Sequence, residues 1–152
     1  MLAQPATTLT FRRLLLTGAA GGLGKELRGR LKRYCEVLRL SDIAAMPAAQ
    51  SHEEVVLCDL ADKRGVDALV AGCDAILHLG GVSVEKSFEE VLGPNISGVF
   101  HIYEAARCHG VKRVVFASSN HAIGFHATAD TLQTDCALRR EGTTVCPKPM
   151  AN

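Results

Sequence analysis

The sequence has no tryptophan, few other aromatic residues and almost no net charge. Aromatic residues make up 5% of the chain, while hydrophobic residues as a whole make up 47%. We therefore expect a core of leucine, valine, isoleucine and alanine, as is usual in α/β proteins. Acidic and basic residues are interspersed and leave a net charge of +1. Because nucleic-acid binding needs a basic surface, no nucleic-acid partner is expected.

Long apolar runs and the features of a secretory signal are also missing. No apolar stretch is long enough to span a bilayer, so no membrane partner is expected. The opening MLAQPATTLTF lacks the basic start and apolar run of a signal peptide, although its alanines and threonines leave a transit peptide as a weaker alternative. A flexible N-terminal tail over residues 1–12 and a cytoplasmic location are the expectations.

The cysteines show no spacing that is typical of a redox motif or a metal site. The chain has no Cys-x-x-Cys pair, and no metal site is expected. Free thiols suit a reducing compartment. We expect the first four cysteines to be small buried hydrophobic residues; the complete set is Cys35, Cys58, Cys73, Cys108, Cys136 and Cys146.

Short apolar runs alternate with stretches of helical periodicity. Leucines recur every four residues after the first run, which predicts an amphipathic helix. The long helical stretch 87–109 is divided at Gly93 and Pro94, and its main part should start near Pro94, because proline fits only a first helical turn. The expected strands are 13–17, 36–40, 55–57, 75–79 and 113–117, and a further helix is expected at 66–71.

This alternation predicts an α/β fold, a doubly wound parallel sheet of the Rossmann type with strand order 3-2-1-4-5. The dinucleotide-binding domain should occupy residues 13–126 and be incomplete. Residues 127–152 show no sustained periodicity and are expected to form an irregular C-terminal tail.

A glycine-rich turn, GAAGGLG, separates the first expected strand from the first expected helix. Its first glycine permits a tight turn, its second lets a pyrophosphate approach the backbone, and its third lets the helix pack on the strand. The pattern is weak by itself, because an ordinary turn before a helix can look the same. The expected cofactor-binding residues of the turn are Gly18, Gly21, Gly22, Leu23 and Gly24.

An acidic residue after the second expected strand supports the dinucleotide interpretation. Asp42 lies where a carboxylate accepts both hydroxyls of an adenosine ribose, and its charge repels a 2′-phosphate, so NAD is favoured over NADP. A turn or helix cap is the alternative role for Asp42. Asp59 and Leu60, after the third strand, are placed to meet the adenine, although a solvated turn aspartate explains Asp59 nearly as well.

Several blocks carry a family resemblance: LLLTGAAGGLG, LRLSD, CDLAD, HLGGVSVEK, GPNISGVFHIYEAAR and VKRVVFASSNHAIGF. Together they resemble the uronate dehydrogenases, extended short-chain dehydrogenases that oxidise galacturonate or glucuronate at C1 to an aldarolactone with NAD. The resemblance runs from about Arg13 to Gly142. It implies that the cofactor is contacted by Leu79, Gly80 and Gly81, and that Asn95 buttresses the site. It also implies that the sugar acid is bound by Ser83, Ser119, Asn120 and His121.

The chemistry of the Ser-Asn-His run fits that role independently. Ser119, Asn120 and His121 follow the carboxyl end of the fifth strand, where such sheets bind ligands, and they can donate hydrogen bonds to a carboxylate or to hydroxyls. A loop histidine with satisfied hydrogen bonds is the alternative for His121. His78 lies inside an apolar strand and is expected to be a packed residue, and the other histidines give no functional signal.

The catalytic chemistry of this class needs a tyrosine base, a lysine that lowers its pKa, and a serine that holds the reacting oxygen. The resemblance assigns the serine to Ser119 and the other two residues to a YxxxK motif. The chain contains no YxxxK motif: its tyrosines are Tyr34 and Tyr103, and neither has a lysine four residues later. This chain is therefore expected to be inactive.

The resemblance stops at Gly142, where the family would continue as YYGLSKxxGE and this chain has TTVCPKPMAN. When the codons are regrouped by one base from the third base of the Gly142 codon, the new triplets permit YYGLSKANGE at every position and force its second glycine. We therefore expect a one-base shift of the reading frame near codon 143, which removes the tyrosine and the lysine. A lesion in the gene and a sequencing error both fit this pattern.

The leading hypothesis is a truncated NAD-dependent uronate dehydrogenase, with a small sugar acid as its partner. The sequence makes no prediction of the oligomeric state. A nucleotide-sugar epimerase or dehydratase of the same superfamily is the first alternative; it should lack the Ser-Asn-His run and have a larger substrate domain. A non-catalytic dinucleotide-binding fragment is the second, and a chain that never accumulates as stable protein is the third.

Overall fold

The computed structural model describes residues 11–119 of the chain. The chain divides into two compact units, Met1–Ala117 and Ser118–Asn152. All of the described helices and strands belong to the first unit. Most of the predicted N-terminal tail and the whole predicted tail 127–152 lie outside the described residues.

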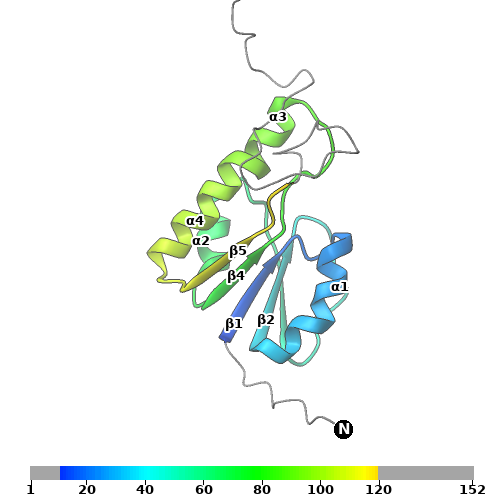
Figure 1. Cartoon of the computed structure of the whole chain (residues 1–152). Helices are drawn as coiled ribbons and strands as arrows, with labels where there is room; N and C mark the ends of the chain where they lie inside the picture. The colour runs from blue at the N-terminus through cyan, green and yellow to red at the C-terminus, as the bar shows by residue number, and fades with distance from the viewer. Residues whose placement is uncertain (1–10, 120–152) are drawn as a thin grey trace, which may run out of the picture. The chain divides into compact units, whose positions relative to one another are not determined.

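Five parallel strands form one sheet in the order β3-β2-β1-β4-β5, which confirms the predicted doubly wound topology (Figure 1). Thr17, at the end of β1, pairs with Ser41 on one side and with His78 on the other, so the carboxyl ends of three strands lie at one edge. The strands are β1 Phe11–Thr17, β2 Cys35–Asp42, β3 Glu53–Leu57, β4 Ala75–His78 and β5 Arg113–Phe116.

Helices cover the sheet on both faces (Figure 1). On one face, α1 (Gly22–Leu31) packs near Leu14, Leu16, Leu38 and Leu40; on the other, α2 (Lys63–Val70) and α4 (Gly98–Cys108) enclose Leu15 and Ile76. Val66, Leu69 and Val70 of α2 are buried. Because the chain changes faces between β1 and β4, the topological switch point lies there, where ligands of such sheets bind.

The helical stretch after β4 differs from the prediction of a separate helix starting near Pro94. Helix α3 (Phe88–Val91) continues through a π-helical turn, Leu92–Ser97, into α4. The wider turn closes with a hydrogen bond from Gly98 N–H to the Gly93 carbonyl. A π turn changes the hydrogen-bonding partner of each residue, so proline is accommodated inside the helix and does not interrupt it.

The expectation that the first four cysteines are buried is only partly confirmed. Cys108 is exposed at the last residue of α4, and Cys58 is only partly buried, whereas Cys35 and Cys73 are buried as expected. All four are free thiols.

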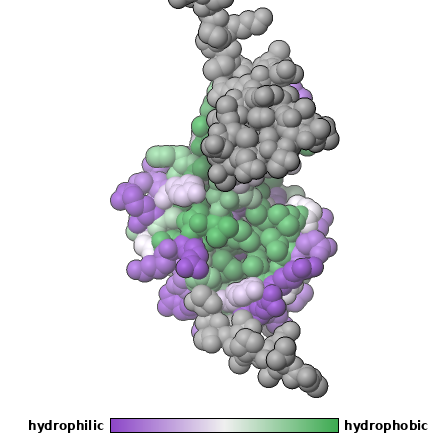
Figure 2. Space-filling view, viewed as in Figure 1, coloured by the Kyte–Doolittle hydropathy of each residue, from purple (hydrophilic) through white to green (hydrophobic). Residues whose placement is uncertain are grey.

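Strand β5 is the least covered part of the sheet. Val115 and Phe116, which point to opposite faces, are 51% and 41% exposed. Figure 2 shows apolar side chains gathered over the strands in the middle of this view. An exposed apolar surface of this kind favours association with other polypeptide. Among residues 11–119, no helix has the length and apolar character to cross a membrane.

Candidate functional site

A cavity of about 830 Å³ lies at the carboxyl ends of the strands. This volume is usual for a small-molecule site. Nearly all of the described residues that the sequence predicts to bind cofactor or substrate line it: Gly18, Gly21, Gly22, Leu23, Gly24, Asp42, Asp59, Leu60, Leu79, Gly80, Gly81 and Ser83. The structure therefore brings together residues from several separate segments of the chain.

The glycine turn forms one wall of the cavity, and two of its glycines are sterically required. Gly18 has a φ of +69°, and a Cβ there would lie 2.7 Å from the backbone carbon of Leu79. A Cβ on Gly24 would collide with the Gly18 carbonyl oxygen and lie 2.7 Å from the Ala19 Cα. The turn thus presents backbone and the start of α1 to the cavity. The first N–H groups of a helix have no acceptor within it, so this wall suits an anion.

Asp42, at the end of β2, connects the glycine turn to the loop that follows the strand. Its Oδ2 accepts a hydrogen bond from Ala20 N–H at 2.9 Å, and its Oδ1 accepts one from Ala44 N–H at 3.0 Å. These are the contacts of the turn-cap role. Because Asp42 also lines the cavity and each carboxylate oxygen accepts more than one hydrogen bond, the ribose role stays a prediction beside it.

Asp59 lies where a second, smaller pocket meets the cavity, and Leu60 follows it in the cavity wall. Asp59 is exposed, and its Oδ1 accepts a hydrogen bond from Ala61 N–H at 2.9 Å, as in an ordinary turn. Leu60 is buried against the same cavity. Cys58 and Asp59 line both spaces. The adenine contact predicted for Asp59 and Leu60 remains a prediction.

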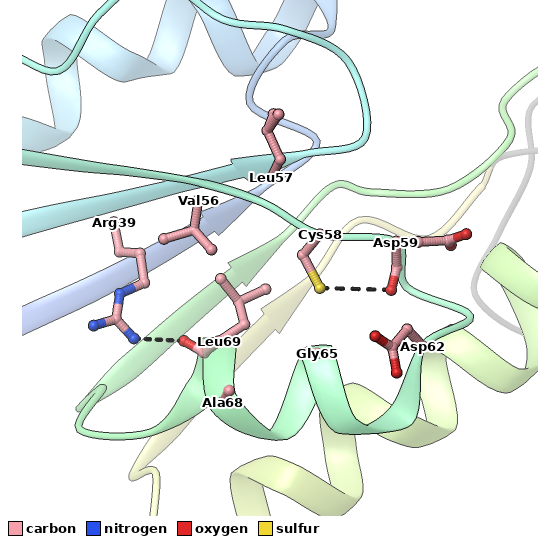
Figure 3. A pocket seen from close by; sticks show the side chains of 9 residues that line it. All are labelled: Arg39, Val56, Leu57, Cys58, Asp59, Asp62, Gly65, Ala68 and Leu69. Atoms are coloured by element: carbon pink, nitrogen blue, oxygen red, sulfur yellow. Dashed lines mark hydrogen bonds between the residues drawn. The ribbon is translucent and has the colours of Figure 1, made fainter.

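The smaller pocket has a volume of about 370 Å³ and lies between β3 and α2 (Figure 3). Arg39 is the cation at one end, but its guanidinium already binds Glu54 at 2.7 Å and the Leu69 carbonyl at 2.7 Å. Burial and the nearby carboxylates of Asp62 and Asp59 raise the pKa of the Cys58 thiol, so it stays protonated. With its cation paired and its thiol unreactive, this pocket is a weaker candidate site than the cavity.

The loop after β4 forms the opposite wall of the cavity, and Asn95 holds it. The Asn95 Oδ1 accepts a hydrogen bond from Val82 N–H at 2.7 Å, and its Nδ2 donates to the Val82 carbonyl at 2.9 Å. Gly81 has a φ of +145°, and a Cβ there would lie 2.9 Å from the Asn95 Oδ1. Asn95 does not line the cavity; its side chain fixes the backbone that does. This geometry is compatible with the buttressing role that the resemblance implies.

Beneath that loop, two buried side chains connect β1 to β4. Thr17 Oγ1 and His78 Nδ1 lie 2.6 Å apart, and Gly80 N–H donates to the same Thr17 oxygen at 3.1 Å. His78 is completely buried and stacks on Phe116, with ring centroids 5.5 Å apart. His78 is thus a packed strand residue, as expected, but it also belongs to a hydrogen-bonded chain that reaches the cavity wall.

His78 should make the protein sensitive to acid. Burial lowers its pKa to about 4 from an ordinary value of 6.5. Between these values the unfolded chain binds a proton that the folded chain does not. The free energy of unfolding should therefore fall by on the order of 3 kcal/mol as the pH drops from about 6.5 to about 4. Urea unfolding across this range measures the effect, and a His78→Phe variant with an equally steep loss would contradict it.

Sequence reasoning missed several residues of the cavity. Lys86 and Glu90 line it and form an ion pair of 3.3 Å, and Thr17 and Pro94 also belong to its lining. The i,i+4 charge spacing of the Lys-Glu pair was a usable signal, but the cross-strand contact of Thr17 was not. Ser119 is exposed and belongs to the second unit. Asn120 and His121 lie outside the described residues.

The donor set of the cavity fits a dinucleotide better than a metal. The glycine turn offers backbone N–H groups beside a space that side chains would fill, and Asp42 offers a carboxylate at the end of β2. Within residues 11–119, no cluster of three histidine, cysteine or acidic side chains that could hold a metal ion occurs. The fold and this arrangement define a protein of the Rossmann type, with a cavity at the strand ends that suits a dinucleotide.

A model of the NAD dependent epimerase/dehydratase family matches residues 14–141, so the chain belongs to this family. Within it, the chain is 73% identical over 134 residues to a uronate dehydrogenase of Pseudomonas putida, covering 88% of this chain and 50% of that protein. It is 68% identical over 140 residues to the uronate dehydrogenase of Pseudomonas syringae pv. tomato, covering 91% of this chain and 51% of that protein.

Comparison with solved structures also finds a uronate dehydrogenase. A mutant of the Agrobacterium tumefaciens uronate dehydrogenase, crystallised in complex with NAD, is similar with a TM-score of 0.81 and 54% identity, covering 84% of this chain and 48% of that one. The chain spans about half the length of the curated relatives that it matches.

Proposed function

We propose that this chain is the NAD-binding half of a uronate dehydrogenase, whose complete form oxidises galacturonate or glucuronate at C1 to an aldarolactone. The observation that supports it best is the cavity itself, which is lined by the glycine turn, Asp42 and the loop after β4. The 73% identity to the Pseudomonas putida enzyme supports the choice of substrate class.

In this proposal, the glycine turn and the start of α1 hold the pyrophosphate of NAD, and Asp42 accepts hydrogen bonds from the adenosine ribose. Leu60 and Asp59 border the adenine, and Leu79 to Gly81, kept in place by Asn95, border the nicotinamide half. When bound, NAD supplies the hydride acceptor. The chain contributes the positions of these groups and excludes water from the buried side of the cavity.

The substrate side is assigned to Ser83, Ser119, Asn120 and His121. Their hydroxyl, amide and imidazole groups can donate hydrogen bonds to a carboxylate and to ring hydroxyls. Ser119 would hold the oxygen at C1, and the proton of that hydroxyl needs a base. We assign the base and its lysine to the YYGLSK segment of the shifted reading frame after Gly142, so this chain can orient a uronate without deprotonating it.

The substrate class can be tested with a chimera that joins residues 1–142 of this chain to the remaining half of the Pseudomonas putida enzyme. With NAD, the chimera should oxidise galacturonate and glucuronate and leave UDP-sugars unchanged. Formation of NADH is followed by absorbance. Turnover of UDP-sugars without turnover of either uronate would replace this proposal by the epimerase or dehydratase alternative.

Asp42 should set the choice of cofactor. A carboxylate beside a 2′-phosphate costs on the order of 1.4 kcal/mol, so the chimera should prefer NAD to NADP by about tenfold or more in kcat/KM. Asp42→Asn keeps the size and one acceptor oxygen but removes the charge, and the preference should fall towards parity. Asp59→Asn, which changes the other aspartate of the cavity, is the matched control and should leave the preference unchanged. If the preference for NAD falls equally in both variants, Asp42 does not contact the ribose.

A further inference from the structure

Three buried polar side chains at the cavity, two in its lining and one behind it, have no role in the function proposed above. Within residues 11–119 the buried polar side chains are Thr17, Ser41 and His78. Thr17 and His78 are hydrogen-bonded to each other, and Gly80 N–H donates to the Thr17 oxygen. Gly80 belongs to the cavity wall, so a contact buried between β1 and β4 ends at a surface that would touch the cofactor.

The direction of the Thr17–His78 hydrogen bond follows from counting donors and acceptors. If His78 Nδ1 carries a proton and donates it, the Thr17 oxygen receives two donors, and its own proton has no acceptor among the described residues. If Thr17 donates its hydroxyl proton to Nδ1, a lone pair of the Thr17 oxygen accepts the Gly80 N–H. His78 Nε2 has no hydrogen-bond partner in the described part of the chain. The first arrangement therefore leaves both the Thr17 proton and Nε2 unsatisfied, whereas the second leaves only the Nε2–H. Unsatisfied buried donors are costly, so the arrangement with fewer is favoured.

We propose that His78 is a positioning residue for the cofactor-binding loop. By accepting the Thr17 hydroxyl proton, it directs the Thr17 oxygen at Gly80 N–H and fixes the loop Leu79–Gly81. The importance assigned to that loop rests on the function proposed above. The position of Gly80 matters for the whole site, because the glycine turn packs directly on it: a Cβ on Gly18 would lie 2.8 Å from the Gly80 nitrogen.

Two further observations agree with this role. Phe116 of β5 stacks on the His78 ring at an interplanar angle of 27°, which restricts its rotation. Burial keeps the imidazole neutral at neutral pH, because it lowers the pKa of His78 to about 4. A neutral ring has one acceptor nitrogen, as the contact requires.

Two substitutions at one position separate positioning from simple packing. His78→Asn keeps a polar atom near the place of Nδ1, whereas His78→Gln keeps one near the place of Nε2 and loses the contact with Thr17. Both remove the ring, so both weaken packing against Phe116. Thr17→Ser and Thr17→Val form a second pair, in which only serine keeps the hydroxyl.

Two measurements are made on the full 152-residue chain without cofactor. Amide hydrogen exchange is followed at Gly80, and nitrogen NMR shows which nitrogen of the His78 ring carries the proton.

We expect the His78 proton on Nε2, and exchange at Gly80 that is about fivefold faster in His78→Gln and Thr17→Val but little changed in His78→Asn and Thr17→Ser. The Kd for NAD, measured on the chain and on the chimera, should rise by about fivefold in the same two variants. A proton on Nδ1, or equal effects of Asn and Gln, would overturn the proposal. If both His78 variants unfold, the Thr17 pair decides it in the same way.

The same data distinguish a failure of this proposal from a failure of the proposed function. Exchange at Gly80 is measured without NAD. If the variants show the expected exchange pattern but the protein does not bind NAD, the positioning role of His78 stands and the cofactor site is refuted. If NAD binds tightly and equally in all four variants, the cofactor site stands and the positioning role is refuted.

Discussion

Incubated with NAD and galacturonate, the 152-residue chain should form no detectable NADH, whereas the chimera should turn over. The chain has no YxxxK motif, and neither of its tyrosines, Tyr34 and Tyr103, lines the cavity. The other ionisable groups there already have partners or stay protonated: Asp42 and Asp59 accept hydrogen bonds from backbone N–H groups, and Lys86 pairs with Glu90. Burial raises the pKa of the Cys58 thiol. Loss of a general base costs about 10²–10⁴-fold, so turnover should lie at least about a hundredfold below that of the chimera.

The control for this comparison is folded protein. Circular dichroism and NAD binding of the chain show whether the Rossmann unit is present when activity is absent. Robust NADH formation by the unaltered chain would mean that another base serves the reaction, and it would refute the assignment of the base to the shifted reading frame.

Replacement of Gly24 by alanine should have the largest effect on stability of any single methyl group added to this unit. The new Cβ would collide with the Gly18 carbonyl oxygen and crowd Ala19, and these are backbone atoms that cannot rotate away. Overpacking against side chains costs about 1–3 kcal/mol, and against fixed backbone the loss should reach at least about 3 kcal/mol. NAD binding should be lost with it, because the turn must open to admit the methyl group.

Gly29→Ala is the matched control on the same helix. A Cβ at Gly29 meets nothing within 4 Å, and Gly29 is an exposed interior residue of α1. Alanine should therefore stabilise the protein by about 0.5–1 kcal/mol through helix propensity, with NAD affinity unchanged. Urea unfolding measures the free energy of unfolding, which should decrease in Gly24→Ala and increase in Gly29→Ala. Similar effects at the two positions would show that close packing at Gly24 is not what the turn requires.

The topology could be predicted because each strand of this sheet is a short apolar run bounded by polar or glycine-rich segments. Buried parallel strands give that pattern, and right-handed crossovers then restrict the strand order. The π turn at Pro94 could not be predicted. Whether a proline interrupts a helix depends on what holds the chain beside it, and here Asn95 is fixed to Val82 across the cavity wall.

The outline of the site was also predictable, since the glycine turn and Asp42 follow strands at characteristic distances. The contacts between segments were not. Thr17 and His78 lie 61 residues apart, and neither has a neighbour in sequence that indicates their pairing. Asp42 shows a further limit: its cap contacts and its predicted ribose contact need the same residue at the same place, so spacing alone does not separate them.

Mapping of bound NAD tests the central claim most directly. In amide spectra of the chimera titrated with NAD, the largest changes should fall on Gly18 to Gly24, on Asp42 and on Leu79 to Ser83. All of those residues except Ala19 line the 830 Å³ cavity. Changes confined to the smaller pocket around Arg39 and Gly65, or no saturable change at all, would contradict the account of this chain as the NAD-binding half of a uronate dehydrogenase.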